Sequence, residues 1–168
     1  MNKQEININT AIARRYLDTY HMLLPDEKIM FDCCCLPSFR WKAFYVQVFE
    51  ENGIYRANCA YTQYRDYFGL NNYSQHFTTI EIINHRAKRG DVFCKSIFPD
   101  RKIIEELLQC ANEYIYNEQP VNKHLTLDGI TARIRLFENG SMTRDIVMID
   151  PDNDVPLLDK ILSLSETI

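Results

Sequence analysis

The chain has 168 residues, 46% of them hydrophobic and 25% charged, which is typical of a globular protein rather than a disordered one. This length suits a single domain over residues 1–168 that buries a core without disulfides. A net charge of −4 argues against direct nucleic-acid binding and favours a basic partner. Because the chain has neither an apolar run of transmembrane length nor a signal-peptide core, we expect a cytoplasmic protein outside the membrane.

The first predicted element is a helix over residues 8–24. Ile8, Ile12 and Tyr16 recur at helical spacing, and Pro25 is expected to stop the helix.

Strands are predicted next. Residues 28–36 form a short apolar run, and residues 41–49 are apolar on both faces, as in a central strand. Asn52-Gly53 is a strong hairpin signal, because both residues tolerate positive φ. The chain should then return over residues 55–61.

This hairpin register places Val46 roughly opposite Cys59.

Residues 62–77 are irregular and rich in aromatic residues. One interpretation is a loop folded back onto the core. The other is a recognition loop, since tyrosine anchors protein interfaces at low entropic cost. Tyr64, Tyr67 and Tyr73 are the candidate partner-binding residues of this loop.

The remaining pattern predicts strands over residues 78–84 and 91–98, and then a helix that Asp100 caps. The apolar stripe of this helix comprises Ile103, Ile104, Leu107, Leu108, Ala111, Tyr114 and Ile115.

A second hairpin is expected to turn at Asn139-Gly140, between residues 130–137 and 145–149. A short helix with Leu157 and Ile161 closes the chain. The predicted fold class is therefore α+β, with an antiparallel sheet of about six or seven strands covered by N-terminal, central and C-terminal helices.

Three arginines of this hairpin are further candidate partner-binding residues. If Asn139 and Gly140 form a two-residue turn, Arg135 pairs with Arg144, and like charges directly opposite are destabilising. Arg133, Arg135 and Arg144 would then form a cationic patch for a carboxylate partner. A shifted register, or neutralisation by a nearby acid, is the alternative.

Six cysteines are present, and none forms a C-x-x-C pair. In a reducing compartment we interpret them as buried free thiols. Alternation along a strand puts Cys34 on the opposite face from Cys33 and Cys35, which disfavours a joint metal or redox site.

Sequence motifs for catalysis, metal ligation and glycine-loop nucleotide binding are missing. The acidic run Asp150, Asp152 and Asp154 lacks the glycine and bidentate glutamate of a calcium loop, so helix capping is the better interpretation. We therefore expect no enzyme activity, cofactor or metal.

The C-terminal quarter runs from Leu127-Asp128-Gly129 through an alternating strand, Asn139-Gly140 and a second strand to Asp150-Pro151 and a leucine-rich helix. This pattern resembles immunity proteins of bacterial polymorphic-toxin and contact-dependent growth inhibition systems. The resemblance implies a cytosolic inhibitor that binds one toxin domain, but no functional residue carries over by position.

The function we expect is specific protein binding, by an immunity protein that masks a toxin active site. Acidic pairs such as Glu50-Glu51 and Glu105-Glu106 would then meet the basic groove of a nuclease. The alternative is a ligand-binding or enzymatic domain with a pocket around Cys33–Cys35, Trp41 and Tyr45. A third reading is a subunit of a homo-oligomer.

Overall fold

The computed structural model describes residues 3–36, 42–62, 92–115, 129–149 and 155–168. They form an α+β fold around a six-stranded antiparallel sheet, as the sequence predicts. In spatial order its strands are β4 (Val92–Ile97), β3 (Ile54–Thr62), β2 (Phe44–Glu51), β1 (Phe31–Leu36), β5 (Thr131–Glu138) and β6 (Ser141–Ile149).

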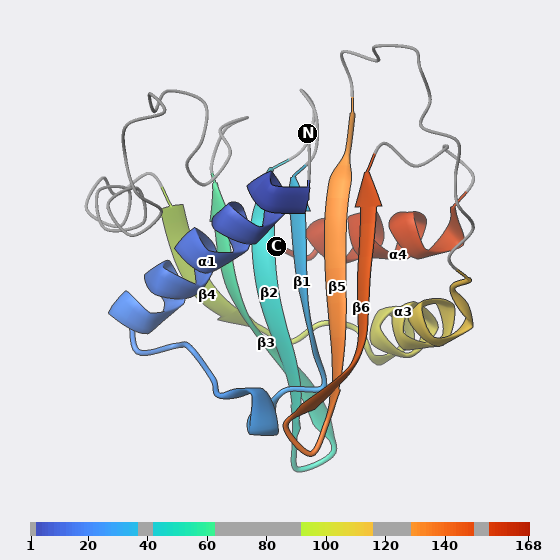
Figure 1. The fold of residues 1–168 in the computed structure, drawn as a ribbon. Helices are drawn as coiled ribbons and strands as arrows, with labels where there is room; N and C mark the ends of the chain where they lie inside the picture. The colour runs from blue at the N-terminus through green and yellow to red at the C-terminus, as the bar shows by residue number, and fades with distance from the viewer. Residues whose placement is uncertain (1–2, 37–41, 63–91, 116–128, 150–154) are drawn as a thin grey trace.

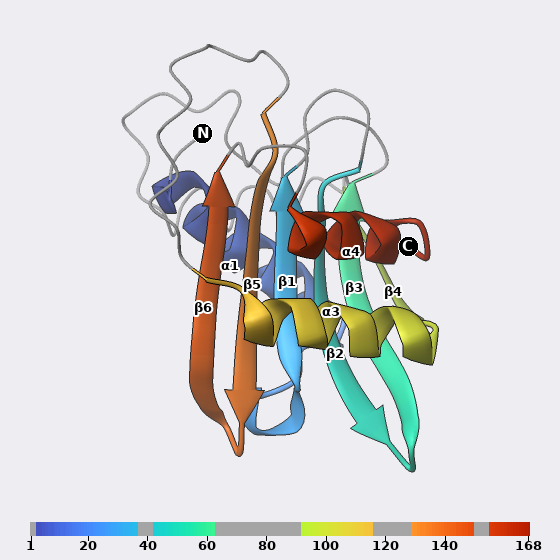
Figure 2. The same ribbon diagram turned by 90° about the vertical axis from the view of Figure 1, so that its right-hand side faces the viewer.

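Helices cover both faces of this sheet. Helix α1 (Lys3–Thr19) crosses one face diagonally (Figure 1). Helices α3 (Arg101–Glu113) and α4 (Pro156–Ser165) lie side by side on the other face (Figure 2). We call these two surfaces of the sheet the α1 face and the α3/α4 face.

The core has two parts, because the central strands are buried on both faces. In β1, Cys33 and Cys35 pack toward α3 and α4, whereas Cys34 packs toward α1. In β2, Val46 packs toward α3 and α4, whereas Tyr45 packs toward α1. The predicted alternation is confirmed.

Helix α1 begins and ends earlier than residues 8–24. It ends at Thr19 because His21 adopts a left-handed conformation with φ 57°. The N–H of Met22 donates to the carbonyl of Leu17 and that of His21 to Asp18, which is a Schellman motif. The sequence gives no clear signal for this helix end, because a histidine occupies the position where glycine is usual.

The structure also corrects or confirms the predicted ends of other helices and strands. The predicted strand over residues 28–36 begins at Phe31, because Asp26–Lys28 forms a short 3-10 helix, η1. Asp100 caps α3 as predicted, by accepting from the N–H of Lys102. The predicted strand over residues 78–84 lies outside the described residues.

Both predicted hairpin turns are confirmed. Asn52 and Gly53 have φ of 55° and 77°, and Asn139 and Gly140 have φ of 50° and 81°. Val46 lies opposite Cys59, as the first turn requires.

The two turns differ in their surroundings, and this difference is testable. A Cβ at Gly53 would meet nothing within 4 Å, but one at Gly140 would lie 2.7 Å from Cγ of Glu27. We expect Gly53→Ala to cost about 1 kcal/mol, the strain of a left-handed alanine. Gly140→Ala should cost roughly 1 kcal/mol more, because η1 must shift. Urea unfolding measures both, and equal losses would contradict this packing.

Candidate functional site

A row of polar residues crosses the whole α1 face, with one member on each strand. Each member lies directly opposite the next in the strand register. In spatial order this polar row comprises Ser96, Asn58, Gln47, Asp32, Arg135 and Asp145.

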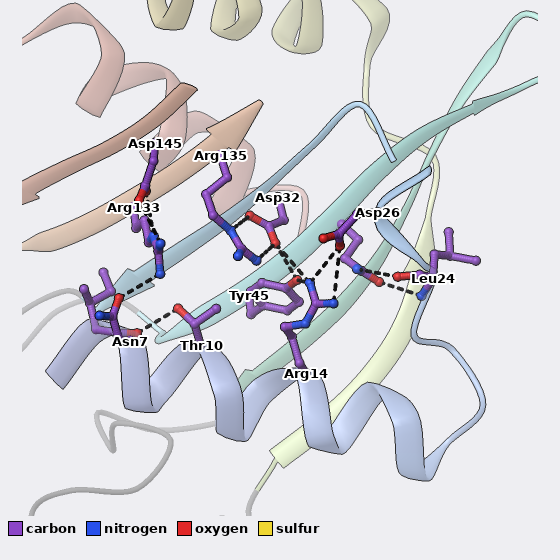
Figure 3. Close-up of polar contacts among 12 residues, drawn as sticks. Asn7, Thr10, Arg14, Leu24, Asp26, Asp32, Tyr45, Arg133, Arg135 and Asp145 are labelled. Atoms are coloured by element: carbon purple, nitrogen blue, oxygen red, sulfur yellow. Dashed lines mark hydrogen bonds and ion pairs between the residues drawn. The ribbon is translucent and has the colours of Figure 1, made fainter. Parts of the chain in front are cut away.

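Asp32 is the centre of the polar row and is only 2% exposed. Arg135 binds it in a bidentate manner, with Nε donating to Oδ1 at 2.8 Å and Nη2 to Oδ2. The hydroxyl of Tyr45 donates to Oδ2 at 2.8 Å, and Nη1 of Arg14 lies 3.4 Å from the same oxygen. Figure 3 shows these side chains converging between α1 and the sheet.

The charges of this cluster balance. Arg14 also contacts Asp26, at 3.4 Å, so two carboxylates meet two guanidiniums. Burial raises the pKa of Tyr45 well above its ordinary value, and the charge of Asp32 raises it further. The phenol therefore keeps its proton and acts as a hydrogen-bond donor, and the cluster holds α1 against the sheet.

Two amides of the polar row hold the connection between α1 and η1. Gln47, fully buried, accepts from the N–H of Leu24 at 2.9 Å and donates to the carbonyl of Leu24 at 3.0 Å. Asn58 donates to the carbonyl of Met22 at 2.7 Å and accepts from the hydroxyl of Ser96. The connection thus runs along the polar row, across β3 and β2, and side-chain amides hold it there.

The polar row was not predicted from the sequence, although the sequence contains a signal for it. Asp32, Gln47 and Asn58 are polar residues with an apolar neighbour on each side in a strand run. A buried polar group needs a hydrogen-bonding partner, so this pattern predicts a polar contact on a covered face.

The structure places the three candidate arginines in different surroundings. Arg133 pairs with Asp145 through two hydrogen bonds of 2.8 and 2.9 Å, and Arg135 pairs with Asp32. Arg144 lies on the α3/α4 face and donates to the carbonyls of Ala111 and Tyr114, where it caps the C-terminus of α3. The three do not form one patch, and a role for them in binding a partner stays a prediction.

The predicted Arg135–Arg144 pairing is wrong. Arg135 lies opposite Asp145, and Arg144 lies opposite Leu136, because the register shifts between Leu136 and Phe137. This bulge replaces a repulsive contact with an attractive one.

Tyr64, Tyr67 and Tyr73 lie outside the described residues, as does Trp41 of the alternative pocket. The thiols of that region are part of the packed core, since Cys33, Cys34 and Cys35 are at most 1% exposed. Burial raises the pKa of Cys34 to about 12 and that of its two neighbours above the ordinary range. These thiols are therefore protonated and poorly nucleophilic at neutral pH.

One end of the sheet gathers exposed acidic residues. The β2–β3 turn, η1 and the β5–β6 turn meet there, because the start of β1 pairs with the ends of β2 and β5 (Figure 1). This end also carries the exposed side chains of Ile54 (55%), Phe98 (68%) and Met142 (52%). We call it the acidic end; its exposed acids are Glu27, Glu50, Glu51 and Glu138.

An arginine stacks between aromatic rings beside the acidic end. The guanidinium of Arg56 lies 5.2 Å from the ring centroid of Phe98 and 5.9 Å from that of Phe49, and it also pairs with Glu51. These contacts hold the exposed ring of Phe98 in place.

The three carboxylates Glu27, Glu50 and Glu138 have no cation within ion-pair distance among the described residues. Of the cations at this end, Arg56 pairs with Glu51, and Arg101, which donates to the carbonyl of Gly53, pairs with Glu105. Lys28 of η1 then stands against three carboxylates, so the acidic end carries a negative excess. Unpaired carboxylates and exposed apolar side chains therefore lie together at this end of the sheet.

Within the described ranges, no three His, Cys, Asp or Glu side chains gather as a metal site would require. None of the helices in those ranges is long and apolar enough to cross a membrane. Comparisons with protein-family models, curated proteins and solved structures found no match to this chain.

The Asp32 cluster gives a stability prediction. We expect Asp32→Asn to destabilise the protein by about 3 kcal/mol, because Arg14 and Arg135 lose their shared buried carboxylate. The control Glu51→Gln breaks an exposed pair with Arg56 and should cost at most about 1 kcal/mol. Denaturant unfolding compares the two variants, and similar losses would show that the cluster is no stronger than a surface ion pair.

Asp145 gives a pH prediction. Burial is the largest single influence and opposes its charge, but the hydrogen bonds and charge of Arg133, together with the charges of Lys3 and Arg135, outweigh it, so the pKa of Asp145 lies below its ordinary value of 3.8. A lowered pKa in the folded state stabilises the protein above the ordinary pKa, and this stabilisation is lost as pH falls through the lowered value. The stability difference between the wild type and Asp145→Asn should therefore shrink below about pH 4. A difference that stays constant from neutral to acidic pH would refute the coupling.

Proposed function

We propose that this chain is a protein-binding protein that recognises a basic protein domain through the acidic end. The observation that carries the proposal is the combination, at that end, of exposed glutamates with large exposed apolar side chains. Interfaces of specific complexes combine apolar anchors with complementary charge, and the charge steers the encounter.

Phe98 and Ile54 are the proposed anchors. Exposing a side chain such as Phe98 to water is unfavourable, and burying it against a partner recovers that free energy. Its ring is already ordered by Arg56, so binding immobilises little additional side chain. Glu50 and Glu138 lie at the two hairpin turns of the same end of the sheet and would pair with cations of the partner.

The buried polar side chains support a binding role rather than catalysis, because they are engaged in hydrogen bonds that hold the fold together. Asp32, Tyr45 and Arg135 satisfy one another, and the amide of Gln47 is engaged by backbone. The biological role we propose is that of an immunity protein that masks the basic substrate groove of a toxin, such as a nuclease, as the C-terminal sequence pattern suggests.

A charge-reversal experiment tests the surface. The triple variant Glu27→Lys, Glu50→Lys and Glu138→Lys is compared with a variant of equal net charge, Glu113→Lys, Asp159→Lys and Glu166→Lys, on α3 and α4. Wild-type protein captures its partner from the native cell, and calorimetry with the purified partner measures Kd. We expect Kd to rise about a hundredfold for the first variant, because interface charges lose their complementarity, and to change little for the second.

Growth measurements test the biological role separately. The partner expressed alone should arrest growth, and co-expression of the wild type, but not of the first triple variant, should restore it. Equal Kd values for the two triple variants would refute the acidic end as the binding surface. A partner that leaves growth unchanged would refute the immunity role while leaving the binding surface standing.

A further inference from the structure

A second charged surface lies at the opposite end of β2 and β3 from the acidic end. The side-chain ammonium groups of Lys42 and Lys95 lie 5.3 and 5.2 Å from the ring centroid of Tyr61. Phe93 is directly opposite Tyr61 in the register, with ring centroids 5.7 Å apart and planes inclined by 30°. We call these four residues the lysine–tyrosine cluster.

All four side chains are on the α3/α4 face. Tyr61 pairs with Phe44 and Phe93, and Lys95 pairs with Cys59, so strand alternation puts Lys42 and Lys95 on the same side of the sheet as Tyr61. Tyr61 packs against the core beneath, whereas Phe93 is 41% exposed and Lys42 is exposed. The cluster is therefore anchored at its base and accessible at its surface.

Within the described part of the chain, no carboxylate compensates the charge of this cluster. Among the described residues, neither Lys42 nor Lys95 has a carboxylate within ion-pair distance. By contrast Arg56, Arg101 and Lys160 each pair with a glutamate. Two ammonium groups near one ring repel each other, and the ring offsets this cost only in part. An anion placed between them would relieve the repulsion.

We propose that the lysine–tyrosine cluster binds an acidic segment of another protein, with carboxylates at the two lysines and an apolar side chain against Phe93. Charge complementarity and the exposed ring carry this assignment, which does not depend on the function proposed for the acidic end. Two lysines supply far fewer cations than the basic stripe of a nucleic-acid-binding surface, so a protein segment is the better-fitting ligand.

Synthetic peptides test this site on the intact chain. A hexamer of glutamate, and a second glutamate hexamer with one central phenylalanine, are titrated against the protein and followed by NMR chemical shifts. We expect saturable binding, weakened by added salt, with the phenylalanine-containing peptide binding more tightly. The double variant Lys42→Gln and Lys95→Gln should raise Kd roughly tenfold, and Phe93→Ala should remove the advantage of the phenylalanine.

The matched control is the double variant Lys28→Gln and Lys102→Gln, which removes the same charge from other exposed positions. Equal weakening in both double variants would show unspecific attraction and overturn the proposal. Tighter binding of a short single-stranded oligonucleotide would overturn it in favour of a nucleic acid. Self-association in light scattering that Lys42→Gln and Lys95→Gln abolish would overturn it in favour of a second copy of this chain.

Discussion

The structure depends on one buried carboxylate. Asp32 lies in the central strand β1, under α1, where an unpaired charge would be strongly unfavourable. It is acceptable there because Arg135 comes from the neighbouring strand, Arg14 from the helix above and Tyr45 from the strand on the other side. One side chain therefore links three neighbouring strands to one another and to α1.

The two faces of the sheet consequently differ in how they hold their helices. Toward α3 and α4 the contact is apolar, and a capping arginine, Arg144, links α3 to the sheet edge. Toward α1 the apolar contact is crossed by the polar row, whose amides also hold the connection after the helix. Hydrogen bonds require a particular geometry, whereas apolar contacts tolerate sliding, so the α1 face is the more specific of the two.

The surface charges are separated along the strands. The hairpin turns and η1 bring glutamates to one end of the sheet, while the far ends of β3 and β4 carry lysines around an aromatic pair. At each end, exposed aromatic or aliphatic side chains accompany the charge. This arrangement gives the protein two separate surfaces of opposite charge, which we propose as its contact surfaces for other proteins.

The sequence by itself determined the secondary structure of most described elements, because alternation, helical periodicity and the Asn-Gly turns are local signals. The sequence did not reveal the end of α1, because the left-handed residue there is His21 rather than glycine. Nor did it reveal the bulge after Leu136, which brings Arg135 opposite Asp145. The polar row, the acidic end and the lysine–tyrosine cluster join residues far apart in the chain. Only the tertiary structure decided these groupings, because strand order and register set which side chains meet.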